Sequence, residues 1–568
     1  MNRVEAKAEL SRRELMKWTG RPVRKMVGES GVGESAISAA GRTTTMRKSS
    51  RLRPGGQSKA VEAPPTAAVI ALNRMGFGPR PGDIGAFLAL GADPQERMQA
   101  YVDQQLNPAS IDDSACDARI VAAGFTTLGK SQAQLWQDHV EADVSWSERM
   151  RPFFEIERMA FLRAVHSKRQ LAEVLADFWH NHFNVYGYEY WIGPLWTYWD
   201  RDVIRGNSLG NFRQMLEAVA AAPCMLYYLD NYTNSSAGPN ENWARELIEL
   251  HTLGAENYLG VMRQVDVPLD GLGRPVGYVD DDVFEATRCF TGWTFDFDTG
   301  LFSYRADWHD HFQKTVLGAF MAPNQAQLAD GRDVLDAVAF HPGTARHIAG
   351  KLCRRFISDD PPQNVVDAAA AVFESAQNDS DQLAQVVRTI LLSDEFLTTW
   401  GEKIKRPFEI AVSAMRSAGA AFSFALAENE TDSFLWRYDQ AGQPLFSWRA
   451  PNGYSDVRED WQSTTPRVHL WRVCNWLVDV ENDFDKHLLD VVEKTPATAR
   501  SANDLADYWI NRVLGRSMPA ADRFEIVDFM AQGFNPNLDL PVDSDWDTQE
   551  RLRAMVGLIF MTPSFLWR

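Results

Sequence analysis

A histidine on an apolar helix face is the first candidate for chemistry in this sequence. Residues 240–254, NENWARELIELHTLG, carry apolar side chains at helical spacing between a Gly-Pro pair and Gly254. This pattern predicts one helix that ends at the glycine. His251 falls in the middle of the apolar face. Because an imidazole buried without a partner costs free energy, we expect His251 to hold a hydrogen bond or a metal ion.

Two glutamates on the opposite stripe of this helix are candidates for a general base or a metal ligand. Glu246 and Glu249 are three residues apart and therefore neighbours on the helix surface. The alternative is a solvated face, on which Arg245 forms ion pairs with Glu241 and Glu249 at i,i+4 spacing. On the predicted helix the glutamates and His251 point in different directions, so one small site would not contain both.

A second core-facing histidine lies in the segment LADFWHNHFNVY, residues 175–186. His182 falls at the centre of the apolar face of a predicted helix, whereas His180 points nearly opposite. Two histidines at this spacing share a metal ion only if the helix ends near Asn181. We predict that His182 and His251 complete one site. The alternative is that both are structural core histidines and that His180 lies on the surface.

The segment HDHFQK offers two further metal ligands. If residues 308–312 are extended, His309 and His311 point to the same side and form a two-ligand clip for zinc, iron or copper. A surface loop is the alternative. Together the candidates predict a site for a divalent or transition metal, with ligands drawn from His180, His182, His251, His309 and His311.

Aromatic side chains suggest a second kind of site. The stretch YGYEYWIGPLWTYW directly follows the two histidines at 180 and 182. Rings beside a polar cleft stack on sugars or aromatic substrates, and an arginine adds a charged contact. The candidate substrate contacts are Tyr188, Trp191, Trp196 and Arg245, and the aromatic wall would be extended by Trp448, Tyr454 and Trp461. The alternative is that the rings pack an irregular segment against the helices.

Basic residues in KLCRRF are open to two interpretations as well. Arg354 and Arg355 would bind a phosphate or carboxylate, or would form ion pairs with this acidic chain. The sequence contains no G-x-S-x-G motif, P-loop, G-x-G-x-x-G unit or H-E-x-x-H motif. The five cysteines are scattered without a C-x-x-C pair, which excludes the common thiolate zinc motifs.

Charge and hydropathy limit the class of partner. The 568 residues carry a net charge of −18, but residues 1–60 contain 14 Lys and Arg against 5 Asp and Glu, which leaves −27 on the remainder. An acidic body is a poor partner for nucleic acid. No apolar run is long enough for a transmembrane helix.

The elements that would position these residues are mainly helical. Helical patterns cover 66–77, 94–106, 151–186, 201–229, 325–340, 342–357, 363–376, 381–396, 403–420 and 503–566. A β insertion at about 257–310 contains a hairpin, WTFDF-DTG-LFSYR, with Trp293, Phe295 and Phe297 on one face. We therefore predict a large, mainly α, orthogonal multi-helix bundle over residues 63–568, with lobes 63–400 and 401–568. Residues 1–62 are predicted to be a disordered basic tail.

Several segments together resemble a bacterial family known as domain of unknown function 1800. They are LNRMGFGPRPGD (72–83), LADFWHNHFNVY (175–186), NENWARELIELHTLG (240–254), FEATRCFTGWTF (284–295), HDHFQKTVLG (309–318), HPGTARHIAGKLCRRFISDDPP (341–362), KRPFE (405–409) and GQPLFSWRAPNGY (442–454). The resemblance implies an exported bacterial protein, encoded beside a second exported protein that is a candidate partner. It implies no particular activity. The 263–280 segment is longer and richer in glycine and proline than the family pattern.

The N-terminal segment bears on localisation. Residues 11–17, SRRELMK, are similar to a twin-arginine export signature. Such a signature is followed by an uninterrupted apolar stretch, whereas Arg21, Arg24, Lys25 and Glu29 interrupt it here. The resemblance therefore predicts a periplasmic or exported protein, and the degenerate signal leaves a cytoplasmic one as the alternative.

Two functional hypotheses follow. The first is a metal-dependent enzyme, hydrolytic or oxidative, in which histidines bind the metal and Glu246 or Glu249 acts as ligand or general base. The second is a non-catalytic exported module that binds a small molecule, a glycan or a protein partner through the aromatic wall.

Overall fold

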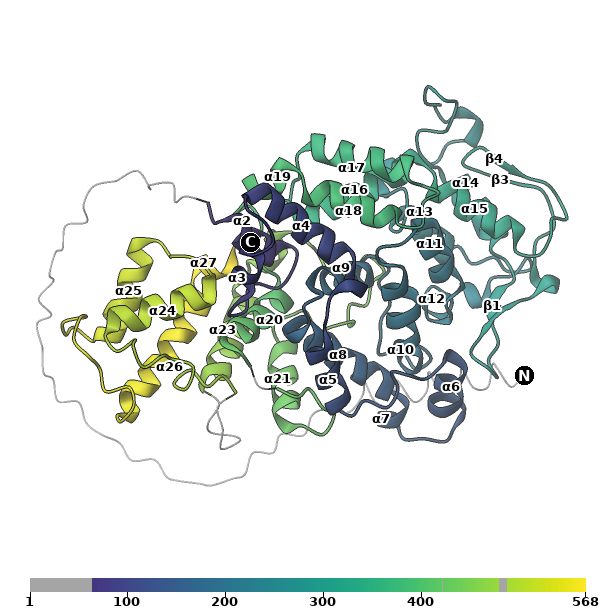
Figure 1. The fold of residues 1–568 in the computed structure, drawn as a ribbon. Coiled ribbons are helices and arrows are strands. Elements are labelled where there is room, and N and C mark those ends of the chain that lie inside the picture. The colour runs from purple at the N-terminus through teal and green to yellow at the C-terminus, as the bar shows by residue number, and fades with distance from the viewer. Residues whose placement is uncertain (1–63, 421, 480–487) are drawn as a thin grey trace, which may run out of the picture. The chain divides into compact units, whose positions relative to one another are not determined.

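Helices make up most of the regular structure of the described chain, which comprises residues 64–420, 422–479 and 488–568 of this computed structural model (Figure 1). The mainly α class is confirmed. The helices of the first half are α2 (Ala67–Arg74), α3 (Asp83–Leu88), α4 (Pro94–Leu106), α5 (Ser114–Ala122), α6 (Gln132–Trp136), α7 (Trp146–Arg149), α8 (Arg151–His166), α9 (Gln170–His182), α10 (Trp196–Tyr198), α11 (Phe212–Ala221), α12 (Pro223–Tyr228), α13 (Asn242–Glu249) and α14 (Asp280–Cys289).

The second half begins after the β insertion and is again helical. Its helices are α15 (Ala329–Ala339), α16 (Pro342–Phe356), α17 (Gln363–Ser375), α18 (Gln382–Leu391), α19 (Asp394–Thr398), α20 (Pro407–Ala418), α21 (Asn429–Asp439), α22 (Arg458–Trp461), α23 (Thr464–Asp479), α24 (Ala502–Leu514), α25 (Ala520–Ala531), α26 (Trp546–Met561) and α27 (Pro563–Leu566). Helices α24 to α26 lie together on the opposite side of this body from the β strands (Figure 1).

The helical pattern over residues 151–186 corresponds to two helices, not one. Helix α8 ends at His166 because the next residue, Ser167, has an extended backbone. The Ser167 hydroxyl donates to Asp113 at 2.6 Å, and that carboxylate also accepts from the Lys168 backbone. A carboxylate from a distant segment therefore holds the break in place, which is information that helical periodicity does not contain.

Two short antiparallel hairpins form the β insertion. Strand β1 (Trp293–Phe295) pairs with β2 (Phe302–Tyr304), with Trp293 opposite Tyr304, so the predicted hairpin is confirmed. Trp293 and Phe295 are both buried in the core. A second hairpin, β3 (Lys314–Val316) with β4 (Ala319–Met321), was not predicted.

Helix α13 is shorter than the sequence pattern predicts. The prediction that one helix runs to Gly254 is wrong, because the helix ends at Glu249 and His251 lies beyond it. The His251 amide donates to the carbonyl of Glu246, five residues back, which widens the last turn. Gly254 then takes a φ of 88°, which an L side chain rarely adopts. The helical wheel therefore does not give the direction of the His251 side chain.

One compact unit comprises residues Pro64–Arg568. Helix α20 is buried along its whole length and packs on α8, α23 and α24, while α16 packs on α17 and α18. Among the described residues, no helix is long and apolar enough to cross a membrane. The predicted basic tail and the SRRELMK motif lie outside the described residues, and the division into lobes 63–400 and 401–568 stays a prediction.

Candidate functional site

The two core-facing histidines lie against each other, which is an arrangement that a shared site would require. The ring centroids of His182, the last residue of α9, and His251 are 5.7 Å apart. His182 Nε2 is 3.1 Å from the carbonyl oxygen of His251, and His251 Nδ1 is 3.0 Å from the carbonyl oxygen of His182. Because a carbonyl only accepts, each of these nitrogens must carry the proton. The pair thus ties the end of α9 to the chain after α13.

The environment of this pair favours neutral imidazoles. Burial is the main cause, and the nearby Lys351 adds to it: together they lower the pKa of His251 to about 3 and hold the pKa of His182 well below its usual range. The remaining ring nitrogens, His182 Nδ1 and His251 Nε2, are buried and have no hydrogen-bond partner in the described chain. A third imidazole, His347 on α16, lies 6.4 Å from the His182 ring and pairs with Glu256 at 2.8 Å.

Asparagines beside His182 position a loop over the end of α9. The side chain of Asn181 donates to the Tyr454 carbonyl and accepts from the Tyr454 amide, both at 2.6 Å. Asn184 donates to the carbonyls of Trp448 and Ala450. At Gly453, which has a φ of 70°, a Cβ atom would lie 2.1 Å from the Asn181 carbonyl oxygen. Position 453 therefore requires glycine. Asn181 and Asn184 hold residues 446–457 in place, and this segment is called the pocket loop.

A cavity of about 680 Å³ lies between the pocket loop, α9 and α16. Four of the segments that carry the family resemblance contribute to it. Its charged and histidine side chains are His182, Lys351, Arg354, Arg355, Arg406, Asp456 and Asp460, and its ring-bearing side chains are Phe178, Trp448, Tyr454 and Trp461.

The three later members of the predicted aromatic wall line this cavity. The Trp448 and Tyr454 ring centroids are 5.0 Å apart, and those of Tyr454 and Trp461 are 6.1 Å apart. Their polar atoms are satisfied by the loop itself: the indole of Trp448 donates to Asn452, and Tyr454 donates to the carbonyl of Pro444. Trp448 remains 37 % exposed, so its face is available to a ligand.

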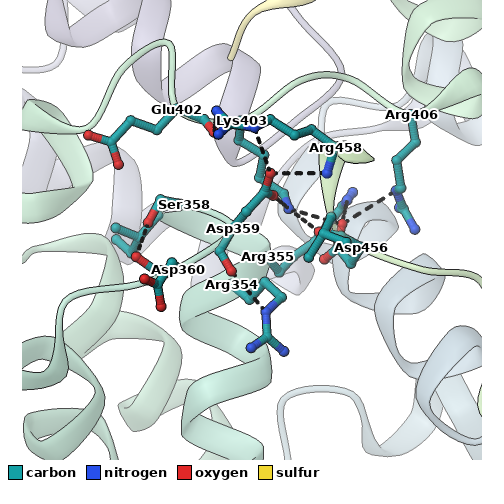
Figure 2. Close-up of polar contacts among 12 residues, drawn as sticks. Arg354, Arg355, Ser358, Asp359, Asp360, Glu402, Lys403, Arg406, Asp456 and Arg458 are labelled. Carbon is teal, nitrogen blue, oxygen red and sulfur yellow. Dashed lines mark hydrogen bonds and ion pairs between the residues drawn. The ribbon is translucent and has the colours of Figure 1, made fainter. Parts of the chain in front are cut away.

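A buried network of charges supports the inner wall (Figure 2). Asp456 lies 3.3 Å from Lys403, 3.5 Å from Arg355 and 3.7 Å from Arg406. Burial alone would raise the pKa of Asp456, but these cations outweigh it and lower that pKa to about 2. Lys403 also pairs with Asp359 at 2.8 Å. Further ion pairs of the network join Arg406 to Asp177 and both Arg355 and Arg568 to Glu409.

Two cations on α16 are left with free donors. The side-chain nitrogen of Lys351 makes no hydrogen bond or ion pair with any residue that the structure describes, although the residue is partly buried. Burial and the neighbouring Arg354 lower the pKa of Lys351 to about 8. Arg354 donates through Nε to the Asp359 carbonyl at 3.1 Å, and its outer nitrogens have no partner among the described residues (Figure 2). The cavity wall therefore carries two positive groups that are not neutralised by direct contact.

His180 occupies a separate buried network. Its Nε2 lies 2.9 Å from Asp200, which pairs with Arg205 at 2.9 Å, and Arg205 pairs with Glu173 at the same distance. The interpretation of His180 as a surface residue is wrong, because His180 is buried and its ring packs against those of Trp196 and Phe446.

The two histidines of HDHFQK are also engaged elsewhere. His309 lies 2.9 Å from the Thr291 carbonyl and 3.1 Å from Asp330, which in turn pairs with Lys314 at 2.6 Å. His311 is exposed, with its ring 5.2 Å from that of His309. In the described part of the chain, no group of three or more His, Cys, Asp or Glu residues is arranged to hold a metal ion.

The earlier aromatic candidates pack in the core. Trp196 is buried against Phe153, Tyr188 packs on the same Phe153 ring at 4.5 Å, and Trp191 stacks on Trp136 at 5.5 Å. None of the three candidates lines the cavity.

The polar side chains of α13, Arg245, Glu246 and Glu249, are partly exposed, whereas His251 is buried. Arg245 pairs with Glu241 at 3.3 Å, the expected i,i+4 ion pair, and lies 3.6 Å from Asp280. Burial and the neighbouring Glu249 raise the pKa of Glu246. Neither Glu246 nor Glu249 lines the cavity.

Sequence reasoning missed three residues that define the cavity: Lys351, Arg406 and Asp456. The available signal was the density of basic residues in KLCRRF and KRPFE within an otherwise acidic chain. Charged residues in helices with few polar neighbours have to be paired or face a cavity.

The family model described as a protein of unknown function, DUF1800, matches residues 70–567. The chain belongs to this family. Comparison with curated proteins and with solved structures found no match.

Proposed function

We propose that this protein binds an organic anion, a small molecule or sugar that bears a carboxylate or phosphate, in the cavity beneath the pocket loop. The observation that carries the proposal is the pair of unneutralised cations, Lys351 and Arg354, on the wall of a cavity of about 680 Å³. The volume falls within the range typical of sites for small molecules.

The electrostatic argument rests on what surrounds each cation. Arg355 and Arg406 are fixed by carboxylates, so they shape the wall without requiring a ligand. Lys351 and Arg354 have donors that only solvent or a ligand can satisfy. A charge-assisted hydrogen bond from either group to an anion contributes about 1.5–3 kcal/mol.

The aromatic lining supports a ligand with a flat or apolar face. Trp448 presents an exposed ring next to Tyr454, and stacking on such rings is the usual mode of binding for sugar rings and aromatic groups. This feature favours the hypothesis of a small-molecule or glycan-binding module, with Trp448, Tyr454 and Trp461 as the wall in place of Tyr188, Trp191 and Trp196.

The metal-dependent enzyme stays a second hypothesis, and the observation that favours it is that two neighbouring imidazole rings each have an unpartnered nitrogen, His182 Nδ1 and His251 Nε2. Elemental analysis of purified protein tests it, with His182→Ala and His251→Ala as the variants. Stoichiometric metal that is lost in both variants would support it, and metal that is retained in both would contradict it. A second exported protein as partner likewise stays a prediction.

A matched pair of sugars tests the anion proposal. Glucuronate and glucose differ at one carbon, where the first carries a carboxylate. Isothermal titration should show binding of glucuronate and weaker or no binding of glucose. Lys351→Ala should weaken glucuronate binding by about tenfold or more, the equivalent of one charge-assisted hydrogen bond.

The control is Lys130→Ala, which removes a lysine that is paired with Asp138 and does not line the cavity. It should leave binding unchanged. Equal affinity for the two sugars, or equal loss of affinity in both lysine variants, would contradict the proposal. Inorganic phosphate and glucuronate should compete if both occupy the cation pair.

A further inference from the structure

One primary amine in this cavity has no partner, and its surroundings suit covalent chemistry. We infer that Lys351 is a nucleophile that forms an imine with the carbonyl group of a bound anionic carbonyl compound, such as a 2-oxo acid. The inference rests on the proposed function, because Arg354 and Lys351 would have to receive the anion before the amine reacts.

The placement of Lys351 differs from that of the two other buried lysines nearby. Lys403 is held by Asp359 and Asp456, so its nitrogen is occupied by ion pairs. Lys405 is buried over the ring of Phe565 at 4.3 Å and does not line the cavity. Lys351 alone among these three lysines is both free of a partner in the described chain and exposed to the cavity.

The chemical requirement is an unprotonated amine near neutral pH. Desolvation and a neighbouring cation both favour the neutral form of a lysine, which is how imine-forming lysines are activated. Both factors act on Lys351, whose pKa is lowered to about 8 by burial and by Arg354. Asp456 and Glu256 oppose the shift, but neither forms an ion pair with Lys351.

The proposed step balances without an oxidant or a reductant. The lone pair of Lys351 Nζ forms a bond to the carbonyl carbon while the C=O π pair moves to the oxygen, and one of the two hydrogens of the nitrogen is transferred to that oxygen. The resulting carbinolamine loses this oxygen as water, together with a hydrogen from the nitrogen, to leave a C=N bond. Protonation of the imine withdraws electrons from the neighbouring carbon that does not belong to the carboxylate, so this carbon can lose a proton and the C–H electron pair forms an enamine with the imine carbon.

The carboxylate of a 2-oxo acid lies one bond from its carbonyl carbon. A guanidinium that binds the carboxylate therefore holds the carbonyl carbon within a few ångström of the guanidinium itself. Arg354 follows Lys351 by three residues on α16, so the two side chains are neighbours on the same helix surface. This spacing suits a compact ligand, with the carboxylate on Arg354 and the carbonyl at Lys351.

Reductive trapping tests the inference on the full-length protein. Pyruvate is incubated with the protein, sodium borohydride reduces any imine to a stable secondary amine, and peptide mass spectrometry locates the adduct. The adduct should form at Lys351 about tenfold faster than at any other lysine and should saturate with pyruvate. Acetone, which has the carbonyl without the carboxylate, should give no selective adduct. The rate at Lys351 should increase as the pH rises through about 8.

Two variants and one internal comparison separate the explanations. Lys351→Arg keeps the charge and should bind glucuronate but form no adduct, and Arg354→Gln should slow trapping by pyruvate. Burial, Arg568 and Arg516 lower the pKa of Lys405 to about 7. Lys405 does not line the cavity, so an adduct at Lys405 would show that a low pKa alone determines which lysine reacts. An adduct at Lys405, an even distribution over surface lysines, or no adduct at Lys351 overturns the inference. Glucuronate binding without trapping refutes the inference alone, whereas absence of both refutes the proposed function as well.

Discussion

The reciprocal pair of His182 and His251 should make the stability of this protein depend on pH in a defined direction. Both imidazoles are neutral in the folded protein, because burial lowers the pKa of His251 from 6.5 to about 3 and that of His182 well below 6.5. The unfolded chain takes up a proton at each position below pH 6.5, whereas the folded chain does not. The free energy of unfolding therefore falls as the pH decreases from 6.5 toward 3.

The magnitude follows from proton linkage. Between pH 7 and pH 5, a histidine that stays neutral when folded and has an unfolded pKa of 6.5 reduces the free energy of unfolding by about 2 kcal/mol. The two histidines together should therefore lower the free energy of unfolding by about 4 kcal/mol between pH 7 and pH 5. Urea denaturation at several pH values measures the change.

Amide side chains provide a test that keeps the hydrogen bonds and removes the titration. Glutamine places its nitrogen where Nε2 of His182 lies, and asparagine places its nitrogen where Nδ1 of His251 lies. The double variant His182→Gln/His251→Asn should lose about 1–3 kcal/mol at pH 7 through poorer packing. It should also show a pH dependence about 4 kcal/mol smaller than the wild type between pH 7 and 5. An unchanged pH dependence in this variant would refute the assignment of neutral, carbonyl-bonded imidazoles.

Three further predictions concern the cavity wall. Asp456→Asn leaves buried cations without a counter-charge and should reduce the free energy of unfolding by about 3–5 kcal/mol in urea titrations, whereas the exposed Asp460→Asn should change it by about 0.5 kcal/mol or less. Gly453→Ala forces a Cβ against the Asn181 carbonyl and should weaken glucuronate binding by displacing the pocket loop, with the far-ultraviolet circular dichroism unchanged. Trp448→Ala should weaken glucuronate binding by about five- to tenfold through loss of ring stacking, whereas Trp448→Phe should restore most of the affinity.

The helices were largely predictable because their apolar periodicity is strong. The expected spans 94–106, 342–357 and 363–376 agree with α4, α16 and α17 within a residue or two. Failures occurred where a distant contact ends a helix. The carboxylate of Asp113 holds the break after α8, and the backbone of His182 accepts the hydrogen bond of His251 after the end of α13. Periodicity contains no information on such contacts.

The candidate site was predictable in part. Two histidines on apolar patterns must find partners, so their juxtaposition was a sound expectation, and Trp448, Tyr454 and Trp461 do lie together. The cavity itself was not predictable, because it depends on which charged residues of KLCRRF and KRPFE are paired. Arg355 and Lys351 are four residues apart on the same helix, yet one is neutralised by carboxylates and the other is not. Only the positions of Asp456 and Glu409 decide this.

The charge distribution explains why a strongly acidic protein is expected to bind an anion. The net charge of −18 repels an anion at long range, but at physiological salt this repulsion is screened beyond about 8 Å. Inside the cavity the nearest groups dominate, and Lys351 and Arg354 are the ones without a counter-charge. Moderate salt should therefore speed the association of an anion, because it screens the repulsion from the acidic exterior. Salt should weaken the contacts of the bound anion with Lys351 and Arg354 less, because water and ions have limited access to the cavity. If salt weakened the affinity as steeply as it does for an anion on an open basic surface, the anion would have to bind outside this cavity.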